Sequence, residues 1–183
     1  MNDIELLQYV HETAEMGIEG LNSLDGQVRD DSLRRVLSQQ GAEYRQIADQ
    51  AERLLRSLGE EPRDPGLLAK VSAEVMSTFK TLADPSASNI AEMVIQGNTM
   101  GATKSTRHLG DYAGGNREIR NLAERLLHTE EANAAQMKQF LYHTRRKAEE
   151  EPPTGGSSSV QRTGSRSSPF RKRSSASWIG ICR

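Results

Sequence analysis

Apolar side chains recur every three or four positions along four long stretches of this chain, the spacing of one buried helix face. The first stretch begins after Asp3, its expected cap, and continues to Val28. The second stretch covers 33–58, and two more cover 88–112 and 117–146. Because only 4% of the residues are aromatic, we expect an all-α protein with helical rather than strand-forming segments.

Short breaks separate the first two helices and the last two. Asp30 and Asp31 supply acidic groups for the exposed N–H groups at the start of the second helix. Gly59 provides the left-handed residue that commonly ends a helix. The run 114–116, Gly-Gly-Asn, turns the chain and caps the last helix. Joints this short predict two antiparallel helical hairpins.

The two hairpins are joined by a longer connection that contains an amphipathic segment of its own, 67–82. Asp64-Pro65 suits the start of this helix and Asp84-Pro85 its end. A hairpin, a long crossover and a second hairpin make the topology of a ferritin-like antiparallel four-helix bundle with an additional crossover helix. The alternative is a plain five-helix bundle in which 67–82 is a full member of the core.

The composition changes abruptly near Glu149. Residues 1–150 carry 18 basic and 24 acidic side chains, whereas 151–183 carry six basic and one acidic. The second part is rich in serine and arginine and has no apolar periodicity, so it cannot recover the entropy lost on ordering. We therefore expect a helical bundle at 1–147 and a disordered C-terminal tail at 148–183.

Several classes of protein are disfavoured by the sequence. Cys182 is the only cysteine, which excludes an intrachain disulfide and a thiolate metal site. No signal peptide and no apolar run long enough to span a membrane are seen, so we expect a cytoplasmic protein. An acidic bundle does not attract nucleic acid, which leaves the basic tail as the only segment suited to it.

Two helices carry fragments of a di-metal motif. Ferritins and rubrerythrins use one Glu on each of two helices and Glu-x-x-His on each of the other two. Glu43-Tyr-Arg-Gln46 and Glu130-Glu-Ala-Asn133 resemble the second pattern, with both histidines replaced by amides. Amides bind iron much more weakly than imidazole. The resemblance implies an iron or manganese site at Glu43 and Glu130, but one that has lost its nitrogen ligands.

A small polar cluster is expected inside the bundle. His11, Gln40, Glu43, Glu130 and Asn133 lie on or near the apolar faces of their helices. A buried carboxylate is costly unless it is hydrogen-bonded, so we expect these side chains to satisfy one another and to fix helix register. The alternative is a metal or small-ligand pocket.

Gly97 and Gly101 lie on the apolar face of their helix, where a glycine costs about 1 kcal/mol relative to alanine. Two explanations stand: close approach of a neighbouring helix, or room for a ligand beside Met93 and Met100.

The segments 3–11 and 89–101 resemble an uncharacterised group of small bacterial ferritin-like, rubrerythrin-like proteins. The resemblance implies the fold and brings no activity. Our first hypothesis is therefore a non-enzymatic bundle without a cofactor that acts through a homo-oligomer or a protein partner. The alternative is a rubrerythrin-like di-iron or di-manganese oxidase or peroxide scavenger.

Overall fold

The computed structural model describes the backbone of residues 1–63 and 85–150 and the side chains of 1–63 and 85–141. The predicted crossover helix at 67–82 and nearly all of the predicted tail lie outside these residues. The chain divides into two compact units, Met1–Glu151 and Pro152–Arg183.

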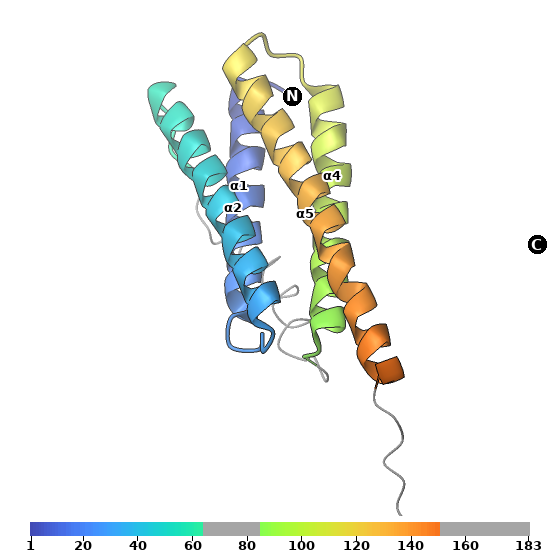
Figure 1. The fold of residues 1–183 in the computed structure, drawn as a ribbon. Coiled ribbons are helices and arrows are strands. Elements are labelled where there is room, and N and C mark those ends of the chain that lie inside the picture. The colour runs from blue at the N-terminus through green and yellow to red at the C-terminus, as the bar shows by residue number, and fades with distance from the viewer. Residues whose placement is uncertain (64–84, 151–183) are drawn as a thin grey trace, which may run out of the picture. The chain divides into compact units, whose positions relative to one another are not determined.

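Four helices make up the first unit: α1 at Asp3–Leu24, α2 at Asp31–Ser57, α4 at Ala87–Asp111 and α5 at Arg117–Glu150. They form an all-α bundle, as predicted (Figure 1). Helices α1 and α2 pair as one hairpin, and α4 and α5 pair as the other. Among these residues there is no strand.

Hydrogen bonds at one end of the bundle show the relative directions of α1, α2 and α4. The Met1 ammonium donates to the carbonyl of Asp111, and the Ala113 N–H donates to the carbonyl of Met1. The backbone N–H of Arg63, just after α2, donates to Gln8 in α1. The start of α1 therefore meets the ends of both α2 and α4. The chain between α2 and α4 thus joins opposite ends of the bundle, which is the connection expected for a ferritin-like topology.

The first helix is capped one residue earlier than predicted. Asn2, not Asp3, is the cap: its side chain accepts a hydrogen bond from the Glu5 N–H, and the Glu5 carboxylate accepts one from the Asn2 N–H. This reciprocal pair is a capping box. The Asp3 carboxylate instead accepts a hydrogen bond from the hydroxyl of Tyr112, at the end of α4.

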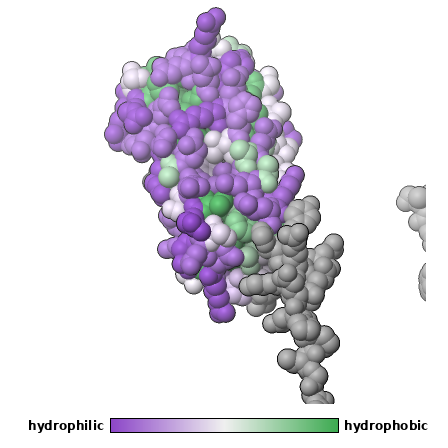
Figure 2. All heavy atoms as spheres, viewed as in Figure 1, coloured by the Kyte–Doolittle hydropathy of each residue, from purple (hydrophilic) through white to green (hydrophobic). Residues whose placement is uncertain are grey.

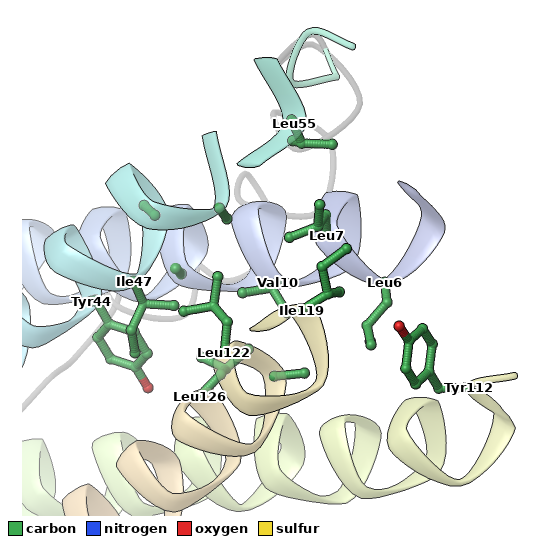
Figure 3. Packing of buried hydrophobic residues seen from close by; sticks show 14 residues of the cluster. Leu6, Leu7, Val10, Tyr44, Ile47, Leu55, Tyr112, Ile119, Leu122 and Leu126 are labelled. Carbon is green, nitrogen blue, oxygen red and sulfur yellow. The ribbon is translucent and has the colours of Figure 1, made fainter. Parts of the chain in front are cut away.

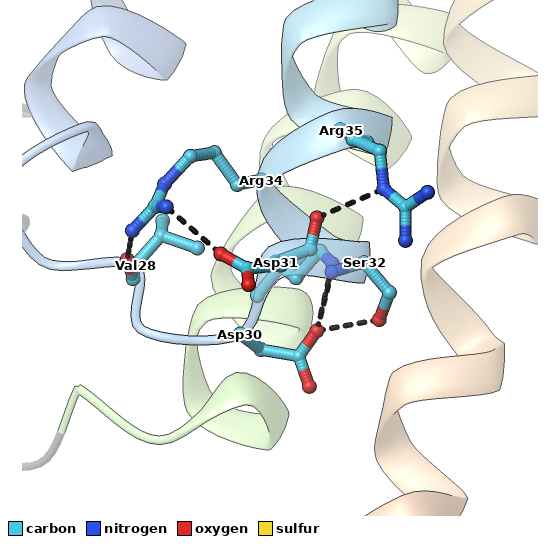
Figure 4. Close-up of polar contacts among 7 residues, drawn as sticks. Val28, Asp30, Asp31, Ser32, Arg34 and Arg35 are labelled. Atoms are coloured by element: carbon cyan, nitrogen blue, oxygen red, sulfur yellow. Dashed lines mark hydrogen bonds and ion pairs between the residues drawn. The ribbon is translucent and has the colours of Figure 1, made fainter.

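The predicted caps of α2 and α5 are confirmed, whereas Asp64-Pro65 lies outside the described residues. At the start of α2, the Asp30 carboxylate accepts a hydrogen bond from the N–H group of Ser32 (Figure 4) and another from that of Leu33. Asn116 does the same for α5 through the N–H of Glu118. Gly59 follows α2 with a φ of +79°, in the left-handed region that favours glycine.

Two helix ends differ from the prediction. Helix α1 ends at Leu24, not near Val28, and the N–H groups of Asp25 and Gln27 bond three residues back, to the carbonyls of Asn22 and Leu24, in the turn that follows. The Val28 side chain is buried although the residue lies in the turn after α1. Its burial explains why the apolar pattern of the sequence extends to it. Helix α5 runs to Glu150, beyond the expected end at Arg146. The predicted domain boundary at 147 stays a prediction.

The buried side chains form two apolar clusters, one toward each end of the bundle. The first joins the start of α1 and the end of α2 to the start of α5, with Leu7, Ile47 and Leu122 among its members (Figure 3). The second joins the other ends of the helices and includes Leu33, Ile90 and Met137.

The face formed by α2 and α5 is mostly hydrophilic (Figure 2). Within the described part of the chain, no helix is both long enough and apolar enough to cross a membrane.

Candidate functional site

A groove of about 500 Å³ runs between α1 and α4, and we call it the α1–α4 groove. Its α1 side runs from Tyr9 to Leu24, and its α4 side runs from Met93 to His108. Tyr44 of α2 and Glu130 of α5 complete its lining. Each long side covers about four helical turns, roughly 22 Å, so the groove is elongated.

The two glycines of α4 have different reasons for lacking a side chain. A Cβ at Gly97 would meet no atom of the described residues within 4 Å, so this glycine opens the groove. A Cβ at Gly101 would overlap Oε1 of Glu130 far inside van der Waals contact, so this glycine makes room for the carboxyl group of α5. Close approach of a neighbouring helix therefore explains the glycine at 101, whereas the glycine at 97 leaves open space in the groove.

Glu130 is held by a hydrogen-bonded chain that crosses three helices. The Ser105 hydroxyl donates to Oε2 of Glu130 at 2.8 Å. The hydroxyls of Tyr9 and Ser105 are 3.0 Å apart. Because serine has one hydroxyl proton and uses it on Glu130, the Tyr9 hydroxyl must donate to Ser105. No described residue provides a hydrogen bond to Oε1.

Burial dominates the protonation of this group. The Glu130 side chain is only 2% exposed. Desolvation raises its pKa from 4.5 to about 7, assisted by the neighbouring Glu131 and opposed by the hydrogen bond from Ser105. Near neutral pH the groove therefore contains a carboxyl group divided between its acid and carboxylate forms.

Tyr44 forms a second polar contact beside Glu130. Its hydroxyl donates to Oδ1 of Asn98 at 2.8 Å, and the Asn98 amide donates to the Val94 carbonyl. Burial, followed by the charge of Glu130, raises the pKa of Tyr44. Its ring also lies 2.9 Å from the position that a Cβ of Gly17 would take. Glycine at 17 therefore lets Tyr44 reach across from α2.

The wall and the mouth of the groove are chemically distinct. Met16, Met93 and Met100 line it, and Met100 is 60% exposed. Methionine is a flexible, polarizable side chain typical of adaptable binding surfaces. Lys104 and Arg107 lie exposed on the α4 side. On the α1 side Glu12 forms an ion pair with Arg63 at 3.3 Å.

Glu43 has a different environment from Glu130. Its Oε1 accepts hydrogen bonds from Nε and Nη2 of Arg125 at 2.9 and 2.7 Å. Both side chains are 37% exposed. Arg125 also donates to Gln46 and Gln50, so this is a polar patch between α2 and α5.

The predicted polar cluster is not joined by mutual hydrogen bonds. The Gln40 amide donates to Gln136, and Glu43 and Glu130 have the partners given above. Asn133 contacts the Tyr44 hydroxyl. Three buried atoms lack a partner in the described part of the chain: His11 Nδ1, Gln40 Oε1 and Asn133 Nδ2.

These positions do not favour a two-metal centre. One oxygen of Glu43 is held by an arginine, whose charge opposes a nearby cation. Within residues 1–63 and 85–141, no group of three or more His, Cys, Asp or Glu side chains is placed to hold a metal ion. The iron or manganese hypothesis stays a prediction for metal analysis.

Two members of the Glu130 chain were not predicted from the sequence. Ser105 follows Asn98 and Gly101 on one face of α4 at helical spacing. That spacing could have predicted that Ser105 lies on the same face as Asn98 and Gly101. No sequence pattern predicts the contact of Tyr9 with Ser105, because the two residues are 96 positions apart.

A family model described as a domain of unknown function, DUF2383, matches residues 2–109. The chain belongs to this family. The match includes α1, α2 and most of α4, and thus both long walls of the α1–α4 groove, whereas Glu130 lies beyond it.

One solved structure with a similar fold is the crystal structure of a DUF305 fragment from Deinococcus radiodurans. It aligns with a TM-score of 0.60 at 14% identity, covering 77% of this chain and 95% of that one. At this identity the similarity supports the fold alone. No curated protein matches the chain.

Proposed function

We propose that this protein is a non-enzymatic helical bundle that binds an amphipathic helix of a partner protein in the α1–α4 groove. The observation that carries the proposal is the methionine-lined wall of the groove, with Met100 60% exposed. Exposed apolar surface of this kind commonly marks a binding site.

The length of the groove favours a helix over a compact small molecule. Four turns of α4, from Met93 to His108, face it. A helix laid in such a groove inserts side chains at positions i, i+3 or i+4 and i+7. The open space at Gly97 gives one of these side chains room to enter.

The charges at the mouth indicate the chemistry of the partner. Lys104 and Arg107 are exposed along α4. A partner helix with acidic residues along the flank that faces α4 complements these cations. We therefore assign the groove to an amphipathic helix with one acidic flank.

The test uses a fluorescent synthetic helix about 18 residues long, with a leucine stripe and an acidic flank. We expect it to bind the wild-type protein and to bind Gly97→Leu at least about tenfold more weakly, because the new side chain fills the groove. Gly110→Leu is the matched control, because position 110 is also in α4 and a Cβ there has no neighbour within 4 Å in the part of the chain that the structure describes. Equal binding by Gly97→Leu and wild type, or no binding to either, contradicts the proposal.

A photoreactive amino acid at position 100 identifies the occupant. Cross-linking of the added peptide supports the proposal. A cross-link to a second copy of the chain, or to residues 64–84 of the same chain, contradicts it.

A further inference from the structure

The α1–α4 groove is apolar along its walls, yet an acid from a third helix enters it. The Glu130 carboxyl group takes the place of the side chain that Gly101 lacks, so an α5 residue lines a groove between α1 and α4. Oε2 is bonded to Ser105 at 2.8 Å. Oε1 has no hydrogen bond and no ion pair from a described residue.

A buried carboxylate that lacks a cation costs free energy. Several groups face Glu130 or lie near it in the groove: Tyr9 and Glu12 of α1, Tyr44 of α2, Lys104, Arg107 and His108 of α4, and Glu131 of α5. The tyrosines stay neutral, because burial raises the pKa of both. None of the cations forms an ion pair with Glu130 in the described part of the chain.

We propose that the helix bound in the groove carries a lysine or arginine within its apolar stripe and that this cation pairs with Oε1 of Glu130 beside Gly101. This inference rests on the proposed function of the groove. It adds the chemical feature that distinguishes the partner from other amphipathic helices. An apolar stripe supplies affinity, and the single buried cation supplies selectivity, because a helix without it leaves the acid unpaired.

The carboxylate is the form that the cation binds. Burial raises the pKa of Glu130 to about 7 in the absence of a partner. Binding of the cation therefore releases a proton from the fraction of molecules that hold the acid form. His108 contributes little above neutral pH, since burial lowers its pKa from 6.5.

The experiment compares two versions of the synthetic helix, one with lysine at the centre of the leucine stripe and one with norleucine there. We expect the lysine peptide to bind the full chain about tenfold more tightly at pH 8. This preference should shrink as the pH falls from 8 to 6, while norleucine-peptide affinity changes little. Calorimetry in buffers of different ionization enthalpy should detect the release of protons when the lysine peptide binds, and none when the norleucine peptide binds.

Glu130→Gln should remove the preference for lysine and its pH dependence. Glu43→Gln is the matched control, because that carboxylate lies outside the groove, beside Arg125. If Glu130→Gln fails to fold, the pH dependence of the wild-type protein decides the question by itself.

The two proposals fail in different ways. If both peptides bind with equal affinity and Gly97→Leu weakens both, the pairing of a cation with Glu130 is contradicted. The proposal that a helix binds in the groove is then unaffected. Absence of binding by both contradicts the groove proposal. A lysine preference that persists in Glu130→Gln places the cation elsewhere and overturns the inference.

Discussion

The carboxyl group of Glu130 lies where a side chain on Gly101 would be. An α5 acid thereby reaches past the backbone of α4 to the hydroxyl of Ser105 and the edge of the α1–α4 groove. A glycine in the interior of a helix and an acid in the interior of a bundle are each unfavourable alone. Here each accounts for the other.

Gly101→Ala should destabilise the bundle, although alanine is the better helix former. The added methyl group overlaps Oε1 of Glu130, and relieving such overpacking typically costs about 1–3 kcal/mol. Urea unfolding followed by circular dichroism measures the change. Gly97→Ala is the control, because its methyl group meets no described atom within 4 Å and should raise stability by up to about 1 kcal/mol. Similar stability of the two variants contradicts the assigned contact.

Glu130 should make stability depend on pH in a defined direction. Its pKa is raised on folding from 4.5 to about 7. Below pH 4.5 the acid is protonated in both states and carries no penalty, whereas above pH 7 the folded chain must bury a carboxylate. The wild-type protein should therefore lose about 3 kcal/mol relative to Glu130→Gln as the pH rises through this window.

Unfolding free energies of both proteins at pH 4.5, 6 and 8 test this expectation. If the difference in unfolding free energy between wild type and Glu130→Gln does not change with pH, the raised pKa of Glu130 is contradicted.

The ion pair of Glu43 and Arg125 should contribute little to stability. Both side chains are 37% exposed, so solvent screens their attraction despite the N–O distance of 2.7 Å. We expect Glu43→Gln to lower the unfolding free energy by less than about 1 kcal/mol, and by still less at high salt. A large loss that is independent of salt shows instead that the pair supports the packing of α2 on α5.

Metal analysis decides between the scaffold and the di-metal alternative. We expect protein purified from cells supplied with iron and manganese to hold no stoichiometric metal, because Arg125 holds the Glu43 carboxylate and Ser105 holds that of Glu130. About two metal ions per chain, lost in both Glu43→Ala and Glu130→Ala, is the result that supports a ferritin-like centre. Glu92→Ala, at an exposed position of α4, is the control.

The helices and most of their caps could be predicted because they depend on local chemistry. Apolar spacing, Asp30, Gly59 and Asn116 each act within a turn or two of their own position. The prediction was wrong where an apolar residue is buried without being helical, at Val28, and where Asn2 rather than Asp3 forms the capping box.

The site was less predictable because it depends on contacts between distant segments. The angular position of Glu130 on its helix correctly placed it inside, but the same reasoning placed Glu43 near it. An angle on a helix face does not say which neighbouring side chain lies opposite, and an arginine of α5 lies opposite Glu43. Tyr9 and Ser105 complete the Glu130 chain through contacts that no local pattern encodes.

The main-chain hydrogen bonds between Met1 and the end of α4 clamp α1 and α4 together at one end of the groove. The frame of the groove is thus fixed by backbone, while its lining of methionines can change rotamer at little cost. Such a binding surface tolerates variation in the shape of what it holds. We therefore expect it to accept a class of related sequences rather than one.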